Sequence, residues 1–177
     1  MCGICGIAVA RGGPQISEGI LRKMNASISH RGPDEDGFYV NEKVGLASRR
    51  LSIIDLTSGT QPISNEDGSI RIVFNGEIYN YRELRDYLEK HGHLFRTQSD
   101  TEAILHLYEE FGTDCLQHLD GIFAFAIWNE NKQELLLARD RMGIKPMYYT
   151  HLPDWQFIFG SEMKSILTNP AVERKID

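Results

Sequence analysis

The chain has 177 residues, of which 41% are hydrophobic and 25% charged, with a net charge of −6 and a pI of about 5.5. These values predict one globular domain with a buried core, and the acidic balance argues against nucleic acid or an anionic membrane as the main partner. No apolar run is long enough to span a bilayer, and no basic region precedes the apolar stretch 3–10, so we expect no signal peptide and a cytoplasmic location.

The apolar pattern of the first half of the chain predicts strands around one helix. Residues 3–10 read as a buried strand, and residues 17–30 as a helix with its apolar side chains on one face. Residues 37–54 suggest two or three short strands. The sequence Glu-Asp-Gly at 66–68 is typical of a hairpin turn, and a strand at 70–75 follows it.

Two capping boxes predict consecutive helices in the middle of the chain. Asn80 is expected to begin a helix that ends near Lys90, and Ser99 a helix that ends near Phe111. In each case a glutamate follows three residues after the cap, where its carboxylate can bond back to the N–H of the cap.

The last part of the chain again reads as strands, at 121–128, 134–139, 147–150 and 156–160, before a short helix at about 162–167. Strands at both ends with helices between them favour an α+β layered architecture over a parallel βαβ fold. We expect the domain to cover residues 1–168.

Residues 169–177 are expected to begin a linker, since Asn169-Pro170 breaks the last helix and a charged tail follows. The chain has no S-G-G-x-D-S loop and no Walker-type loop, so on its own it is not expected to use ATP. An excised domain is the preferred interpretation, and a truncated product and a free-standing subunit are the alternatives.

The three cysteines, Cys2, Cys5 and Cys115, do not resemble a disulfide framework. Cys2 and Cys5 form a C-x-x-C pair, which could indicate a zinc or a redox site. Zinc would need two further ligands, but the chain has no second C-x-x-C and a single close histidine pair, His91 and His93. A redox pair would open a helix after a strand, whereas this pair lies in a predicted strand. We therefore expect no metal site.

Cys2 is a candidate nucleophile because removal of Met1 would make it the N-terminal residue. Its own α-amine, with a pKa of roughly 7.7–8.0 in model peptides, would then lie beside its thiol. One residue would supply both nucleophile and base. The alternative is a small buried hydrophobic residue on a strand.

A series of motifs surrounds this cysteine and continues through the chain. They are MCGI at the start, HRGPDEDG at 30–37, RRLSIIDLTSGTQP at 49–62, FNGEIYNY at 74–81, SDTEAI at 99–104, DGIFAFAIW at 120–128, ARDRMGIKPMYY at 138–149 and GSEMKSIL at 160–167. Together they resemble class II glutamine amidotransferases, the N-terminal-nucleophile type, and within these the glutaminase domain of glutamine-hydrolysing asparagine synthetases. The resemblance implies a four-layer αββα sandwich of two antiparallel sheets with helices outside.

The resemblance also implies how an amino-acid substrate is held. Arg50 would bind the α-carboxylate through its planar fork of donors, and Asp100 and Glu77 would bind the α-ammonium. Arg49 is not expected to take part, because adjacent strand residues face opposite sides. The surrounding pocket wall is implied to include Leu51, Ile53 and Ile54.

For the reacting amide, the resemblance implies an oxyanion hole made by the side-chain NH₂ of Asn75 and the backbone N–H of Gly76. The competing interpretation is that Asn-Gly forms an ordinary turn. Arg31 is expected to order the pocket near Cys2 rather than to react. No metal or organic cofactor is expected in this domain, and Mg-ATP only in a synthetase domain that the chain lacks.

The function implied is hydrolysis of L-glutamine to L-glutamate and ammonia through a γ-glutamyl thioester on Cys2. The ammonia would serve asparagine synthesis from aspartate and ATP in a synthetase domain, in cis or as a separate subunit, and a homodimer is left open. The alternatives are a free-standing glutaminase, a non-enzymatic glutamine sensor and an amidotransferase for another acceptor.

Overall fold

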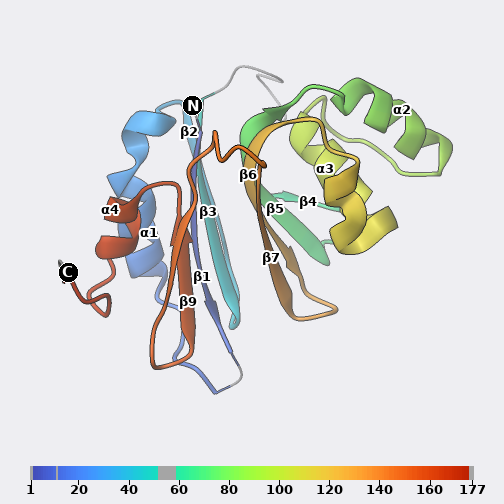
Figure 1. Ribbon diagram of the computed structural model, residues 1–177. Helices are drawn as coiled ribbons and strands as arrows, with labels where there is room; N and C mark the ends of the chain where they lie inside the picture. The colour runs from blue at the N-terminus through green and yellow to red at the C-terminus, as the bar shows by residue number, and fades with distance from the viewer. Residues whose placement is uncertain (1, 11, 52–58, 176–177) are drawn as a thin grey trace.

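Two antiparallel sheets face each other in the middle of the molecule, and helices cover the outer face of each sheet (Figure 1). The computed structural model describes residues 2–10, 12–51 and 59–175. The five-stranded sheet has the order β2 (Glu35–Val40), β3 (Val44–Arg50), β1 (Gly3–Val9), β9 (Gln156–Gly160) and β8 (Tyr148–His151). The four-stranded sheet has the order β4 (Ile63–Ser64), β5 (Ile70–Ile78), β6 (Gly121–Asn129) and β7 (Glu134–Arg139).

The helices divide between the two outer faces. The five-stranded sheet is covered by α1 (Glu18–Ser27) and α4 (Met163–Leu167), and the four-stranded sheet by α2 (Tyr81–Lys90) and α3 (Asp100–Phe111). Short 3-10 turns follow α1 and α3, at Ser29–Arg31 and Gly112–Gln117. The predicted α+β, four-layer αββα sandwich is therefore confirmed.

Alternation along the strands separates three apolar cores. On β1, Ile4 faces the space between the sheets, whereas Cys5 and Ile7 face α1. On β5, Val73 faces the other sheet, whereas Phe74 packs towards α3. Both faces of each sheet are therefore buried, and the pocket that brings the predicted site residues together lies at the ends of the strands.

The structure differs from the sequence predictions at the ends of the elements. The strand expected at 70–75 continues to Ile78 in β5, so Asn75 and Gly76 pair with Ala124 and Phe123 of β6. The interpretation of Asn-Gly as a turn is therefore excluded.

The first capping box is wrong in detail. The side chain of Asn80 does not cap α2; it bonds to the N–H of Asp120 and the carbonyl of His118 instead. The second is half confirmed. Ser99 caps α3 as predicted, but it accepts the N–H of Thr101 rather than that of Glu102, and the carboxylate of Glu102 accepts the N–H groups of Arg96 and Thr97.

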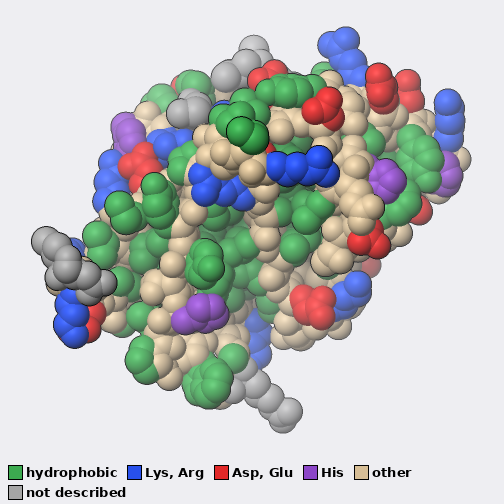
Figure 2. All heavy atoms as spheres, viewed as in Figure 1, with side chains coloured by type: hydrophobic (Ala, Val, Ile, Leu, Met, Phe, Trp, Pro, Cys, Tyr) green, Lys and Arg blue, Asp and Glu red, His purple; other side chains and the backbone are tan. Residues whose placement is uncertain are grey.

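Across the described residues, no helix has the length and apolar character needed to cross a membrane. On the face shown in Figure 2, hydrophobic side chains are visible in the hollow between the two sheets, and charged side chains gather over the helices of the four-stranded sheet.

Candidate active site

A pocket of about 110 Å³ lies at the end of the sandwich where β1 begins. The predicted site residues that line it are Cys2, Arg50, Leu51, Asn75, Gly76, Glu77 and Asp100. The other lining residues are Gln61, Phe74, Ser99, Thr101 and Lys145. Two further predicted residues, Ile53 and Ile54, lie outside the described part of the chain.

The register of the strands explains why residues so far apart in sequence meet here. Gly3 pairs with Arg49, which places Cys2 opposite Arg50 across β1 and β3. By alternation, Cys2 lies on the same side of its strand as Ile4, which faces the space between the sheets. Asn75 is likewise two residues beyond the inward-facing Val73 on the opposite sheet.

Arg49 faces away from the pocket, as predicted. Its Nε donates to the carbonyl of Asn25 on α1 over 3.3 Å. Arg50, by contrast, is only 5% exposed and forms a 2.9 Å ion pair with Glu35, the residue of β2 that pairs with it in the sheet. Thr60 donates to the same carboxylate oxygen over 3.1 Å. A strand neighbour therefore fixes the guanidinium of Arg50 at the pocket wall.

The backbone of Cys2 is held by Arg31, which does not line the pocket. Its Nε donates to the Cys2 carbonyl over 2.9 Å, and its Nη1 lies 3.1 Å from Glu162. Burial raises the pKa of Glu162, but the hydrogen bonds from Arg31 and His30 outweigh it and lower the pKa to about 2. Arg31 thus has a permanent counter-ion. The half-buried Sγ of Cys2 donates weakly to the carbonyl of Leu51 over 3.8 Å.

Asn75 presents a buried amide whose donor has no hydrogen-bond partner. The residue is 1% exposed, and its Nδ2 finds no acceptor in the described part of the molecule. Buried donors are nearly always bonded in folded proteins, so such a group calls for a ligand or another explanation. Its position beside Cys2 makes a negatively charged oxygen in the pocket a suitable partner.

The geometry of β5 directs the N–H of Gly76 towards the edge of the strand that faces away from β6. On the edge away from β6, the N–H of Phe74 donates to Gln61 over 2.6 Å and the N–H of Ile78 to Asp100 over 3.1 Å. With a period of two, the N–H of Gly76 points between these contacts. A Cβ at Gly76 would lie 2.3 Å from the carbonyl oxygen of Ile122, so this position requires glycine.

Two carboxyl groups, those of Asp100 and Glu77, border the pocket at the start of α3 and the end of β5. Burial raises the pKa of Asp100 to about 6, against the lowering effect of its backbone hydrogen bonds, and the charge of Glu77 adds to the increase. A cation in the pocket would favour the ionised carboxylate.

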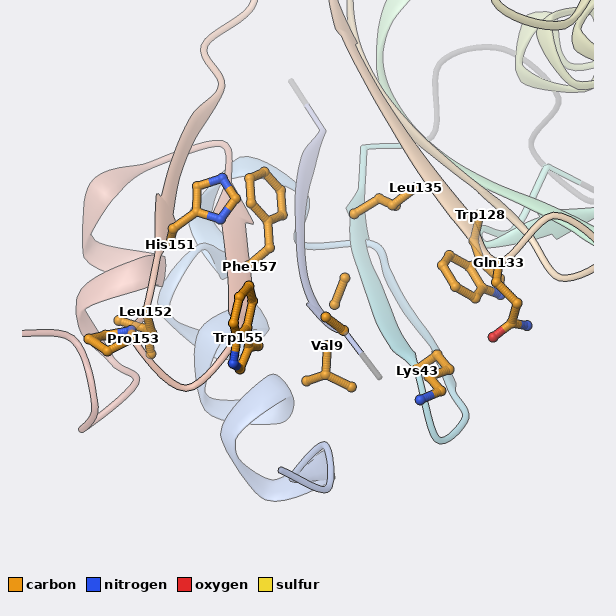
Figure 3. A pocket seen from close by; sticks show the side chains of 12 residues that line it. Val9, Lys43, Trp128, Gln133, Leu135, His151, Leu152, Pro153, Trp155 and Phe157 are labelled. Carbon is orange, nitrogen blue, oxygen red and sulfur yellow. The ribbon is translucent and has the colours of Figure 1, made fainter. Parts of the chain in front are cut away.

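A larger cavity, of about 950 Å³, lies elsewhere (Figure 3). Its lining residues Ala8 and Val9 are at the end of β1 opposite to Cys2, and Trp128, Trp155 and Phe157 make it mainly apolar. Its size exceeds that of the first pocket, but its described lining residues include no cysteine, serine or threonine and no carboxylate. The chemistry therefore places the candidate active site in the smaller pocket.

Cys5 lies on the opposite face of β1 from Cys2, in the core under α1. It is fully buried, and burial raises the pKa of its thiol to about 12. The C-x-x-C pair therefore does not act as a unit, because its members face different layers and one thiol stays protonated.

Sequence reasoning missed the residues that hold the site in place, namely Glu35, Gln61 and Glu162, and Lys145, which lines the pocket. Each of these residues lies inside one of the motifs that carry the resemblance. Their distances along the chain from the residues that they contact follow no pattern that could have revealed those contacts. Glu35 contacts Arg50 only through the β2–β3 register. Gln61 reaches the N–H of Phe74 only because β5 passes beside it.

Known proteins share much of this sequence. A family described as "Glutamine amidotransferase domain" matches residues 1–177. Asparagine synthetase [glutamine-hydrolyzing] 2 of Bacillus subtilis is 48% identical over 180 residues, which cover 100% of this chain and 24% of that protein. Asparagine synthetase [glutamine-hydrolyzing] 3 of Arabidopsis thaliana is 42% identical over 166 residues, which cover 94% of this chain and 28% of that protein. The chain therefore spans about a quarter of the length of these curated relatives.

Solved structures share the fold. Glutamine phosphoribosylpyrophosphate amidotransferase from B. subtilis, complexed with ADP and GMP, superimposes with a TM-score of 0.76 at 24% identity, over 94% of this chain and 43% of that one. A structure described as the allosteric regulatory enzyme of purine biosynthesis gives a TM-score of 0.78 at 25% identity over the same shares.

Proposed function

Because the chain belongs to the glutamine amidotransferase domain family, we propose that its pocket hydrolyses L-glutamine to L-glutamate and ammonia, with Cys2 as nucleophile. The observation that carries the proposal is the meeting of Cys2, Arg50 and the unbonded amide of Asn75 at one end of the sandwich. They supply a nucleophile, a carboxylate-binding cation and a donor for an oxyanion.

The reaction follows from these positions once Cys2 carries a free α-amine. The amine takes the thiol proton, and Sγ bonds to the side-chain amide carbon of glutamine. The oxygen that becomes negative accepts bonds from Asn75 Nδ2 and the N–H of Gly76. The protonated amine then gives its proton to the departing nitrogen as the C–N bond breaks, which releases ammonia. Water attacks the γ-glutamyl thioester, breaks the C–S bond and frees glutamate and the thiol.

The direct test is covalent trapping. A glutamine analogue with an electrophilic carbon in place of the side-chain amide should label the protein once, and peptide mass spectrometry should place the label on Cys2. Labelling should slow in proportion to added glutamine. A label on the buried Cys5 or Cys115, or labelling that glutamine does not slow, would show that the pocket is assigned wrongly.

Replacing Arg50 by lysine should raise KM for glutamine by roughly 10- to 100-fold with a smaller change in kcat. Lysine keeps the charge but loses the planar fork that bonds a carboxylate through two donors. Steady-state kinetics measures the effect. Arg49→Lys is the matched control, since Arg49 points to α1; an equal rise in KM for both variants would contradict the assignment.

Glutamine binding should weaken as pH falls through about 6, because the carboxylate of Asp100 that we assign to the α-ammonium becomes neutral there. Below that pH, Kd should rise by about tenfold per pH unit. Calorimetry on the Cys2→Ala variant separates this effect from the titration of the nucleophile and its amine. Asp100→Asn should bind weakly at every pH; a pH dependence that persists in this variant assigns the effect to another group.

In the whole protein, we propose that the ammonia passes to an ATP-using synthetase domain, in cis or as a subunit, that makes asparagine from aspartate. The names of the relatives and their greater length support this proposal. Residues 169–177 would lead into that domain, Mg-ATP would be needed only there, and the protein would be cytoplasmic. Asparagine formation from glutamine, aspartate and ATP by the full-length protein tests it; transfer to a different acceptor would leave the glutaminase proposal intact.

A further inference from the structure

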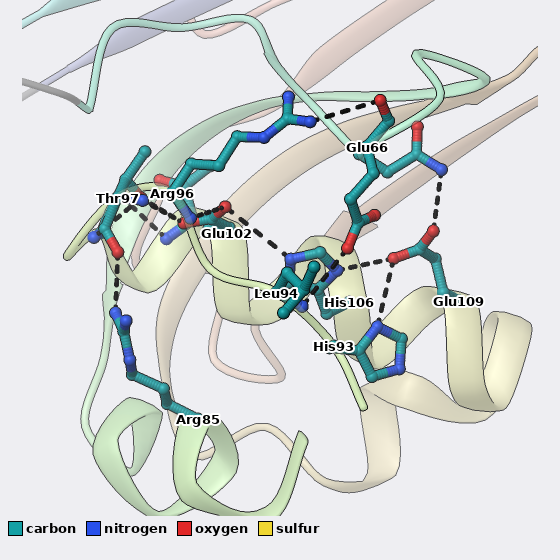
Figure 4. Close-up of polar contacts among 12 residues, drawn as sticks. Glu66, Arg85, His93, Leu94, Arg96, Thr97, Glu102, His106 and Glu109 are labelled. Atoms are coloured by element: carbon teal, nitrogen blue, oxygen red, sulfur yellow. Dashed lines mark hydrogen bonds and ion pairs between the residues drawn. The ribbon is translucent and has the colours of Figure 1, made fainter. Parts of the chain in front are cut away.

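A second cluster of polar side chains lies on the outer face of the four-stranded sheet, away from Cys2 (Figure 4). It joins three segments: Glu66 from the β4–β5 turn, His93 from the α2–α3 connection and His106 from the middle of α3. One carboxylate oxygen and one ring nitrogen of each histidine lie within 4.8 Å of one another. Since zinc holds nitrogen and oxygen ligands at about 2.1 Å, a small inward shift of these side chains would bring all three onto one ion.

His106 is the unusual member of the cluster. It is 1% exposed, yet its Nε2 has no hydrogen-bond partner among the described residues. The nearest carboxylate oxygen, on Glu102, is 3.7 Å away, which is too long for a hydrogen bond. Burial lowers the pKa of His106, but the nearby carboxylates of Glu102 and Glu109 outweigh it and raise the pKa to about 9. A metal ion would therefore bind this ring by displacing a proton.

Carboxylates also surround the two histidines in the arrangement typical of metal sites. His106 Nδ1 lies 2.6 Å from Glu109, which in turn accepts a 2.8 Å bond from Asn65. His93 Nε2 lies 2.9 Å from Glu110. Ligand histidines commonly bond through their second nitrogen to a carboxylate, which fixes the ring and its tautomer. Here Glu109 supports His106 and Glu110 supports His93, and the other nitrogen of His93 lies 3.6 Å from Glu109.

We propose that Glu66, His93 and His106 bind a divalent transition-metal ion of the zinc class. One carboxylate and two imidazoles suit zinc and its neighbours better than magnesium or calcium, which prefer sites made of oxygen atoms alone. Three protein ligands leave a fourth position for water or a neighbouring carboxylate. This site is separate from the glutaminase pocket and does not depend on the function proposed for it.

The role that fits the location is structural. The ion would tie the β4–β5 turn and the α2–α3 connection to α3, three segments that are otherwise joined by side-chain bonds. In one of these bonds the backbone N–H of Thr97, just ahead of the first turn of α3, donates to the carboxylate of Glu102. Asp100 of the glutaminase pocket lies in that first turn, so bound metal would stiffen the helix that places it.

The test is a titration of the full chain with Co²⁺, followed by displacement with Zn²⁺. All proteins carry Cys2→Ala, because a thiol that lines a pocket can bind the same ions. We expect one ion per chain, the visible absorption of cobalt bound by nitrogen and oxygen without a thiolate band, and a rise in the unfolding temperature with Zn²⁺. His93→Gln and Glu66→Gln should each weaken binding by at least about tenfold.

His91→Gln is the matched control. His91 lies two residues from His93, but its Nδ1 contacts the carbonyl of Tyr87 and its ring stacks on Tyr87, outside the cluster. This variant should bind cobalt like the parent. His93 and Glu66 are preferred to the buried His106 as test positions because their replacement leaves the core intact. Binding that survives both variants, or no cobalt spectrum and no shift in unfolding temperature, would overturn the proposal.

Discussion

Replacing Cys2 by alanine should reduce glutamine hydrolysis by a factor on the order of 10⁴ to 10⁶, the loss seen when an enzyme loses its nucleophile. The side chain is the one thiol in the pocket, since Cys5 and Cys115 are buried in the described structure. Ammonia and glutamate release, measured together, gives the rate. The rates at which the two products are released should fall by the same factor.

The same variant should still bind glutamine, because Arg50 and Asp100 lie on other strands and helices and keep their contacts. Calorimetry with Cys2→Ala therefore distinguishes a lost nucleophile from a collapsed site. Residual hydrolysis within tenfold of the parent protein would assign the nucleophile to another group.

Asn75→Ala should lower kcat by about 10² to 10³, equivalent to about 2.7–4 kcal/mol of transition-state stabilisation. KM should change little, because the oxyanion exists only as the reaction proceeds. Stability should also change little for a buried polar residue, since the donor that is removed has no partner in the described structure to leave unpaired. Steady-state kinetics and thermal unfolding together measure both expectations.

Asn129 is the control for Asn75. It is also a buried asparagine, on the neighbouring strand β6, but its amide donates to Tyr108 and its carbonyl accepts from Lys132. Asn129→Ala should therefore lower the unfolding temperature and leave kcat near that of the parent. If the two variants exchange these effects, Asn75 is a structural residue and the oxyanion hole lies elsewhere.

The sequence predicted most of the fold because its local signals agree with one another. The apolar run of β6, the cap at Ser99 and the breaks between strands each point to the element that forms. The end of β5 was missed because Asn-Gly is equally typical of a turn, and only pairing with Ala124 and Phe123 extends the strand through it. The cap at Asn80 failed because its amide finds partners beyond the helix.

The site residues were predicted through motifs, whereas their supports depend on three-dimensional neighbours. The pairing of Arg50 with Glu35 depends on a strand register, and the bond from Gln61 to Phe74 depends on two segments lying side by side. The Glu66, His93 and His106 cluster has no local spacing at all. No pattern along the chain could have indicated it.

The most direct test of Cys2 as both nucleophile and base is glutamine hydrolysis by two forms of the same chain, distinguished by mass spectrometry. One form begins at Cys2 with a free α-amine, and the other retains Met1, which converts that amine into an amide. We predict ammonia and glutamate release by the first form and a loss of at least about 10² in the second, because the amide can neither accept nor return the proton. Equal rates for the two forms would contradict the assignment of Cys2 as both nucleophile and base.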